Sequence, residues 1–165
     1  MVLVAASSAT VIQARSSPLA AVKAFYAYDR SHSQVFNRRN IEARRRWFDD
    51  ALYKLLLKEL DREREYLKQN PTDKPHFGDG LPFQPPDEMC EVGGKKYRRQ
   101  LQYGAVTVKE DTGNVDVRFV YPTPCKIEPV LYAIHMTKIK GRWLIENVLY
   151  PGSRTLVEDL EREEY

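Results

Sequence analysis

The sequence has few residues of the kinds that build metal centres or disulfide-stabilised scaffolds. Only two of its 165 residues are cysteines and only three are histidines. Cys90 and Cys125 lie far apart in the chain and match neither a metal-ligand spacing nor a Cys-x-x-Cys redox motif. We therefore expect no metal site and no cofactor. In an oxidising compartment the two cysteines can form one disulfide, whereas in the cytosol they would remain thiols.

A large charge surplus and a long apolar segment are also absent. The formal net charge is +3, and a surplus of that size does not indicate nucleic-acid binding unless it gathers on one face. The most basic stretch, residues 38–46, has no glycine-rich phosphate motif beside it. We interpret it as the solvated face of a helix rather than a phosphate or acidic-partner site. The apolar start of the chain is too short to span a bilayer.

Residues 1–14 are small or apolar and carry no charge. They resemble the hydrophobic end of a secretory signal, although the positively charged start of such a signal is missing. We interpret residues 1–16 as the remnant of a signal peptide or as a disordered tail. The favoured location is therefore periplasmic or extracellular, with the cytoplasm as the alternative. No lipid-accepting cysteine lies near Met1, so a lipoprotein is not indicated.

Apolar residues at helical spacing predict two helices near the start of the chain. The first begins at Ser17, an N-cap residue followed by Pro18 at the first helical position, and it ends in the polar stretch 29–34. The second is shorter, with Asn40 as its N-cap and Phe48 near its end.

A third helix is predicted from Asp49 or Asp50, either of which would cap it, and it stops before Pro71. One apolar stripe runs along it: Leu52, Leu55, Leu56, Leu60 and Leu67. Residues 70–86, rich in proline and glycine, predict a long loop whose aromatic side chains pack onto the body. We expect one core that includes Phe25, Leu55, Leu56, Trp143 and Ile145.

The periodicity becomes extended after Gly93-Gly94 and predicts four strands. They cover about residues 97–110, 115–121, 130–138 and 142–150, and residues 111–114 supply the first hairpin turn. This order predicts an α+β fold in which N-terminal helices pack on a curved antiparallel four-stranded sheet. One domain would cover residues 17–152, followed by an acidic C-terminal tail at residues 153–165.

The last predicted strand carries a resemblance to a known superfamily. Residues 140–150, with the sequence KGRWLIENVLY, resemble the final strand of nuclear-transport-factor-2-like (cystatin-like) domains, which often close on Gly-x-Trp-x-Ile-x-x-Val. Residues 18–26 are similar to the first helix of that superfamily, where an aliphatic residue and a Phe-Tyr pair line a cone-shaped interior. Residues 52–56 and 80–84 resemble the bacterial family called domain of unknown function 3828, many members of which look exported. The resemblance implies a cone-shaped domain and rests on packing motifs.

Enzymes of that superfamily place an Asp or His base and Tyr or Asp donors inside the cone. His135 is the histidine placed to face an interior, and Asp116 shares a strand face with Arg118, but alternation alone does not say which face is concave. The sequence shows no Ser-His-Asp order and no phosphate-binding glycine loop. We therefore assign no catalytic residue.

The favoured function is a non-catalytic, exported bacterial domain that binds a small molecule or a protein partner. Its candidate ligand-binding residues are Tyr103, Arg118, Tyr132 and His135. The alternative is a ketosteroid isomerase-like isomerase or lyase that acts on a small hydrophobic substrate with His135 or Asp116 as base. A homodimer formed through the sheet is compatible with both. We also expect Cys90 and Cys125 to pair, because both lie in loops that border the sheet.

Overall fold

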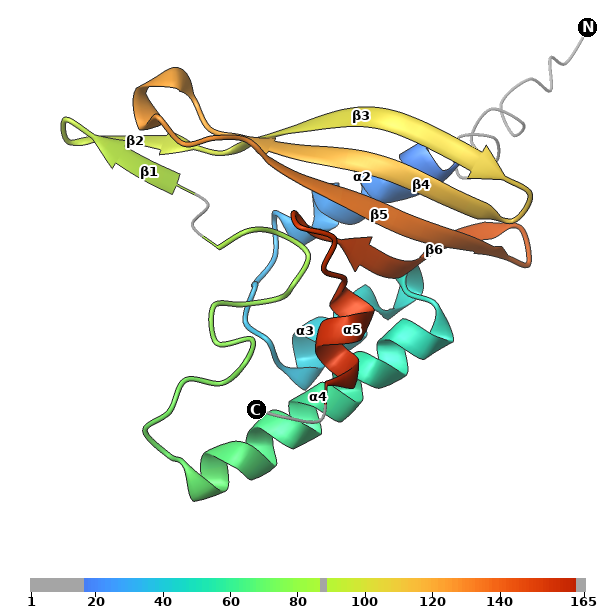
Figure 1. Cartoon of the computed structure of the whole chain (residues 1–165), viewed down its shortest axis with the longest axis horizontal. Helices are drawn as coiled ribbons and strands as arrows, with labels where there is room; N and C mark the ends of the chain where they lie inside the picture. The colour runs from blue at the N-terminus through green and yellow to red at the C-terminus, as the bar shows by residue number, and fades with distance from the viewer. Residues whose placement is uncertain (1–16, 87–88, 163–165) are drawn as a thin grey trace, which may run out of the picture.

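The computed structural model describes residues 17–86 and 89–162 and has an α+β fold (Figure 1). The helices come first: α2 (Pro18–Asp29), α3 (Arg38–Arg44), the 3-10 helix η1 (Arg45–Trp47) and α4 (Asp50–Gln69). A hairpin of β1 (Met89–Val92) and β2 (Lys95–Arg98) follows the long loop. The main sheet then comprises β3 (Gln100–Lys109), β4 (Thr112–Val120), β5 (Val130–Ile139) and β6 (Arg142–Leu149). The 3-10 helix η2 (Thr123–Cys125) precedes β5, and α5 (Leu156–Glu161) comes last.

The main sheet is antiparallel, with the strand order β3-β4-β5-β6. The expected class, helices followed by a four-stranded antiparallel sheet, is therefore confirmed, and the sheet is open rather than closed. Figure 1 shows the described helices on one side of this sheet, while the other face, called here the open face, has no described helix over it. Residues 1–16, interpreted above as a signal remnant or tail, lie outside the described residues.

The core lies between the sheet and the helices and is rich in aromatic rings. Phe25 of α2 contacts Phe83 of the long loop with ring centroids 5.2 Å apart, and Phe83 stacks on Phe48 at 4.9 Å. Tyr26 meets Phe119 of β4 at 5.8 Å. The loop therefore contributes to the core, as its aromatic composition predicted. Of the expected core residues, four are buried and one, Leu55, is partly buried: Phe25, Leu56, Trp143 and Ile145 are the buried ones.

The structure identifies the N-cap residues of α3 and α4. α3 is capped by Asn37, whose side chain accepts a hydrogen bond from the Asn40 backbone N–H at 2.9 Å, so the prediction of Asn40 as the cap was wrong. Asn40 instead donates its side-chain amide to the Val35 carbonyl at 2.8 Å. For α4, Asp49 is the cap and accepts from Leu52 N–H at 2.8 Å.

The first hairpin turn also lies elsewhere than expected. Strand β4 already begins at Thr112, so the turn is made by Glu110 and Asp111, with Glu110 at a φ of 53°. Gly113 is a strand residue packed against the core. A Cβ atom there would lie 3.1 Å from the Trp143 ring and 3.2 Å from Pro18. This glycine allows close packing of the sheet on α2 rather than a reversal of the chain.

Two elements that the sequence did not predict are strand β1, before the main sheet, and helix α5, after it. The first expected strand is divided into β2 and β3, and β2 pairs with β1 across the Gly93-Gly94 turn. The segment 153–165, expected as an acidic tail, contains α5, so that prediction was wrong for the described part. Thr155 and Glu158 form a capping box at its start, and Leu156 and Leu160 are buried in the core.

A buried ion pair joins α2 to α3. The Arg44 Nε donates to Asp29 Oδ1 at 2.6 Å, and both side chains are 0% exposed. The remaining Arg44 nitrogens donate to the backbone oxygens of Asn40 and Ser33, each at 3.0 Å. Burial of two charges is tolerable only when their hydrogen-bonding groups are satisfied, and this arrangement meets that condition.

The same ion pair is connected to the long loop and to the start of β3. The Gln84 side-chain amide donates to the second oxygen of Asp29, and its oxygen accepts from Arg99 Nη2 at 2.8 Å. Arg99, itself buried, also donates to the Pro85 carbonyl at 2.7 Å. The chain Arg44–Asp29–Gln84–Arg99, called here the buried polar chain, therefore fixes the loop between the helices and the sheet.

Removal of the central carboxylate tests this arrangement. We expect Asp29→Ala to lower the free energy of unfolding by about 3–5 kcal/mol, because it leaves the Arg44 guanidinium buried without its partner. Asp61→Ala is the matched control, since Asp61 pairs with Arg64 and Arg38 while its side chain is 50% exposed, and it should cost less than about 1 kcal/mol. Urea unfolding of both variants measures the difference; equal losses would contradict the prediction.

Candidate functional site

The four predicted ligand-binding residues do not converge on one site. Tyr132 pairs with Val117, and both side chains face the helices. Arg118 and His135 occupy the intervening positions of their strands and point to the open face, because side chains alternate along a strand. Tyr103 of β3 is the register partner of Val117 on the opposite edge of β4, so its side chain also lies on the helix-covered face. The structure therefore places Tyr103 and Tyr132 on the helix-covered face and Arg118 and His135 on the open face.

The two candidate bases lie outside the helix-covered interior. His135 lines a hollow of about 260 Å³ on the open face together with Asn114 and Glu146. Burial raises the pKa of the Glu146 carboxyl, nearby Asp49 raises it further, and His135 lowers it. Asp116 lies opposite the irregular part of β3, beside Gly104. Neither base faces the aromatic core that the superfamily resemblance suggested.

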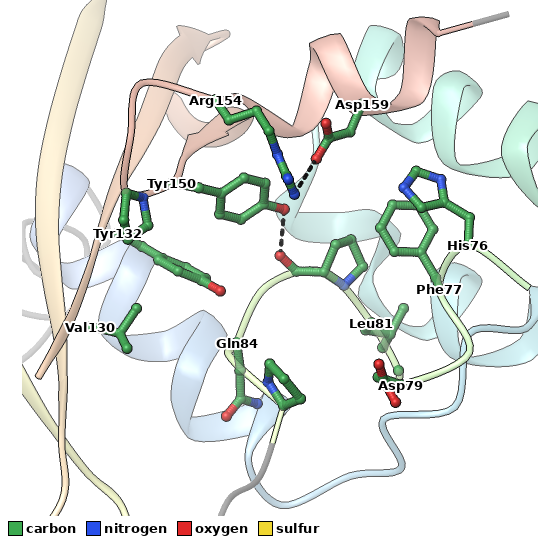
Figure 2. Close-up of a pocket in the computed structure, with 14 residues that line it drawn as sticks. His76, Phe77, Asp79, Leu81, Gln84, Val130, Tyr132, Tyr150, Arg154 and Asp159 are labelled. Atoms are coloured by element: carbon green, nitrogen blue, oxygen red, sulfur yellow. Dashed lines mark hydrogen bonds and ion pairs between the residues drawn. The ribbon is translucent and has the colours of Figure 1, made fainter. Parts of the chain in front are cut away.

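A second candidate site is a hollow of about 390 Å³ with both apolar and polar side chains in its wall, called here the loop pocket. It lies between the long loop, the start of β5, the end of β6 and α5 (Figure 2). Aromatic and aliphatic side chains form much of its wall, and a few polar groups reach into it. The side chains that line it include His76, Phe77, Asp79, Leu81, Gln84, Val130, Tyr132, Tyr150, Arg154 and Asp159.

Helix α4 holds the outer part of the loop through two buried carboxylates on one helix face. Glu59 Oε1 bonds His76 Nδ1 at 2.9 Å, and Glu63 Oε1 accepts from the Phe77 backbone N–H at 2.6 Å. Burial raises the pKa of Glu63, and the neighbouring Glu59 charge adds to the rise, whereas the hydrogen bond from Phe77 opposes it. These contacts give the outer loop a defined position.

The inner part of the loop is tied to the core and the sheet. The Tyr150 hydroxyl donates to the Pro82 carbonyl, and the Tyr26 hydroxyl donates to the Phe83 carbonyl, both at 2.8 Å. Gly80 packs so closely on the chain between α2 and α3 that a Cβ atom would lie 2.9 Å from the Gln34 carbonyl oxygen. With the buried polar chain, these contacts form the loop pocket before any ligand arrives.

The charged side chains around the loop pocket are paired with one another. Arg154 Nη2 lies 3.1 Å from the buried Asp159 carboxylate, as Figure 2 shows. Asp79 pairs with Lys74 at 2.6 Å, and His76 is bound to Glu59. The pocket is thus close to neutral, and a ligand would meet no uncompensated charge there.

Tyr132 presents to the pocket a hydroxyl that has no hydrogen-bonding partner among the described residues. Only 8% of this residue is exposed, and its ring packs against Phe119 and Tyr150 at centroid distances of 5.0 and 4.9 Å. No described residue forms a hydrogen bond with its hydroxyl, which points away from the sheet into the pocket (Figure 2). Burial raises the pKa of Tyr132 to about 12, so the hydroxyl is neutral and able to donate. A ligand or water in the pocket can therefore form a hydrogen bond with this hydroxyl.

Sequence reasoning found Tyr132 but missed the rest of the loop pocket. His76 and Gln84 belong to a loop, where no periodicity tells which side chains turn inward. Arg154 and Asp159 lie in the segment interpreted as a tail. One signal was available: Thr155 followed three residues later by Glu158 is the capping-box pattern of a helix start.

Comparison with protein-family models, curated proteins and solved structures found no match for this chain. In the described segments, no group of three or more His, Cys, Asp or Glu side chains is arranged to hold a metal ion. No helix in the same segments is long and apolar enough to cross a membrane.

The state of Tyr132 can be tested by stability measurements. Tyr132→Phe should change the free energy of unfolding at neutral pH by less than about 0.5 kcal/mol, because no internal hydrogen bond is lost. Tyr150→Phe, the control, should cost about 1 kcal/mol, because it leaves the Pro82 carbonyl without its donor.

The alkaline range gives a second readout. The folded-state pKa of Tyr132 lies above its unfolded value of about 10. The unfolded chain therefore loses this proton first, and the stability that neutral Tyr132 contributes is lost as the pH rises from about 10 to about 12. Tyr132→Phe should lose less stability than the wild type over that range. Parallel pH profiles would contradict the assignment.

Proposed function

We propose that this protein is a non-catalytic binding domain whose loop pocket holds a small, neutral and largely apolar organic molecule. The observation that carries the proposal is the Tyr132 hydroxyl, which belongs to a residue only 8% exposed, reaches into a charge-balanced pocket and has no hydrogen-bonding partner among the described residues. A ligand with one carbonyl, ether or hydroxyl oxygen would satisfy it. The volume of about 390 Å³ lies within the usual range for small-ligand sites.

The walls of the pocket support an apolar ligand body. Phe77, Leu81 and Val130 line it beside the Tyr132 and Tyr150 rings. A flat aromatic or alicyclic body would cover these surfaces and remove them from water, which is the main source of affinity in such sites. A charged ligand would have to displace one of the existing ion pairs, so we favour a neutral one.

We also propose that the domain is of the nuclear-transport-factor-2-like (cystatin-like) type and closest to the bacterial family called domain of unknown function 3828. The element order supports this, as does the packing of the helices against one face of the antiparallel sheet. The two regions that carry the resemblance, in α2 and β6, both contribute buried residues to one core. The cone-shaped interior of that superfamily belongs to the same proposal.

Binding without turnover is favoured because the titratable groups of the loop pocket are already engaged. His76 is bound to Glu59, and Asp159 is paired with Arg154. An isomerase or lyase that used His135 or Asp116 as base would have to work on the open face, away from the loop pocket. A second copy of the chain docked on the open face would leave the loop pocket accessible, so a homodimer is compatible with the proposal.

Ligand screening by NMR tests the function. Neutral cyclic alcohols and ketones should shift the amide signals of Phe77, Leu81 and Val130. Tyr132→Phe should weaken binding by about fivefold to tenfold, the value of one neutral hydrogen bond. Tyr97→Phe, on the remote β1–β2 hairpin, is the matched control and should bind as the wild type does.

Two results would overturn the proposal. One is unchanged affinity in Tyr132→Phe, and the other is a set of ligands whose shifts map to the open face. The same compounds are assayed for turnover by following double-bond migration in a β,γ-unsaturated ketone. Turnover that is lost in His135→Ala or Asp116→Asn while affinity remains would establish the isomerase alternative.

We further propose that the protein works in an oxidising compartment outside the cytoplasm. Cys90 in β1 and Cys125 in η2 form a disulfide with α-carbons 5.9 Å apart, inside the distance that such a bond allows. The bond joins the β1–β2 hairpin to the segment between β4 and β5. Such bonds persist in exported proteins and are reduced in the cytosol.

Thiol counting tests the compartment. Protein taken from its native compartment under alkylating conditions and then unfolded without reductant should show no reactive thiol, and reduction should release two. Two reactive thiols before reduction would contradict export and favour the cytoplasm. A Cys125→Ala variant, which leaves Cys90 unpaired, calibrates the assay at one thiol.

A further inference from the structure

A second and larger hollow, of about 610 Å³, lies between α2 and the edge strand β3. It is called here the α2–β3 site. Three cationic side chains line it: Lys23 and Arg30 from one side, and Arg98 from the end of β2. No carboxylate is among the described residues that line it. It therefore differs from the loop pocket, where the acids Asp79 and Asp159 are each paired with a cation.

Neither Lys23 nor Arg30 forms an ion pair with a described residue that would neutralise its charge. Arg30 Nη2 donates to the Arg99 carbonyl at 2.9 Å, a neutral acceptor that orients the guanidinium without cancelling its charge. Lys23 Nζ lies over the Tyr103 ring, 5.4 Å from its centroid. Neither side chain is within ion-pair distance of a carboxylate in the described part of the chain. The adjacent Asp29 is turned inward and is occupied by Arg44 and Gln84.

The floor of the α2–β3 site is apolar and aromatic. Tyr26, Leu101 and Tyr103 line it, and the Tyr26 hydroxyl is already committed to the Phe83 carbonyl. Burial raises the pKa of Tyr103, while the nearby Arg30 charge lowers it, which places that charge within electrostatic reach of the aromatic floor. Cations at the rim thus surround a surface that gains from contact with an apolar body.

We infer that the α2–β3 site binds a small organic anion that has an aromatic or alicyclic body and one carboxylate, sulfonate or phosphate group. The anionic group would lie between Lys23 and Arg30, where it relieves the repulsion of like charges. The body would cover Leu101 and Tyr103. This inference does not depend on the loop pocket, because the two sites share no lining residue and select ligands of different charge.

The arrangement also explains why Arg30 is positioned by a carbonyl rather than by a carboxylate. A carbonyl contact fixes one nitrogen and leaves the positive charge available to an incoming anion. Arginine suits this role, since its fork of donors can hold the backbone oxygen and the ligand at the same time. Lys23, an exposed point charge on α2, adds attraction that falls with salt.

The test uses 8-anilinonaphthalene-1-sulfonate, an aromatic sulfonate whose fluorescence rises on binding, with the full chain in its disulfide-bonded form. We expect saturable binding that weakens at least about fivefold in Lys23→Gln and in Arg30→Gln. Raising NaCl from about 20 to about 300 mM should also weaken it. The uncharged N-phenyl-1-naphthylamine should bind at least about tenfold more weakly than the sulfonate. Lys54→Gln, an exposed lysine on α4, is the matched control and should bind within about twofold of the wild type.

The inference would be overturned by no saturable binding to the wild type or by unchanged affinity in Lys23→Gln. A loss confined to Arg154→Gln would also overturn it, because that result would locate the probe in the loop pocket. Arg30→Gln loses the contact to the Arg99 carbonyl and can destabilise the fold. Lys23→Glu therefore provides a second variant, because this exposed residue makes no ion pair with the described residues. It should reduce affinity more than Lys23→Gln, and an equal or higher affinity would contradict the inference.

Discussion

The buried pair of Asp29 and Arg44 is the interaction on which the arrangement of the other elements depends. Two charges removed from water must be compensated almost completely, and here the compensation comes from four separate parts of the chain. Asp29 ends α2, Arg44 ends α3, and Gln84 extends the contact to Arg99 before β3. A loop without regular structure thereby acquires one position, because displacement of Gln84 would remove one hydrogen bond from buried Asp29 and one from buried Arg99. The aromatic contacts of Phe83 then add the apolar surface that a buried loop segment needs.

Both proposed sites adjoin this buried polar chain, the loop pocket at Gln84 and the α2–β3 site through the bond from Arg30 to the Arg99 carbonyl. The loop pocket exists because the loop is held against Tyr132 and Tyr150, while the α2–β3 site begins one residue after Asp29, at Arg30. Side chains of consecutive helix residues point about 100° apart, so the Asp29 side chain enters the core while the Arg30 side chain faces β3. Arg99 links both, since its side chain holds Gln84 and its carbonyl holds Arg30. The cation at the loop pocket, Arg154, is paired with the carboxylate of Asp159, whereas Lys23 and Arg30 at the α2–β3 site are paired with no described carboxylate. The two sites therefore favour ligands of different charge.

Much of the fold could be predicted from the sequence because burial imposes periodic patterns on helices and strands. The stripe of α4 and the extended runs of β4 to β6 are such patterns, and the loop was identified by its prolines and glycines. The caps were less certain, because Asn37 and Asn40 are equally suitable residues and only the turn before α3 distinguishes them. The role of Gly113 depends on Trp143 and Pro18, which are distant in sequence. The candidate site could not be predicted because it combines loop residues with α5. Strand alternation puts Tyr132 and His135 on opposite faces of the sheet, but it does not reveal which face the helices cover.

Amide hydrogen exchange measures directly whether the buried polar chain holds the long loop in a preformed position. The Leu81 N–H donates to the Gln34 carbonyl at 2.7 Å, so in the wild type it should exchange only by large-scale unfolding, as the β4 and β5 amides do. The Gly94 amide, in the turn of the β1–β2 hairpin, provides an exposed reference within the same protein. In Gln84→Ala, exchange at Leu81 should rise by at least about tenfold while the β5 amides keep most of their protection. A Leu81 amide that exchanges as fast as Gly94 in the wild type would contradict the account.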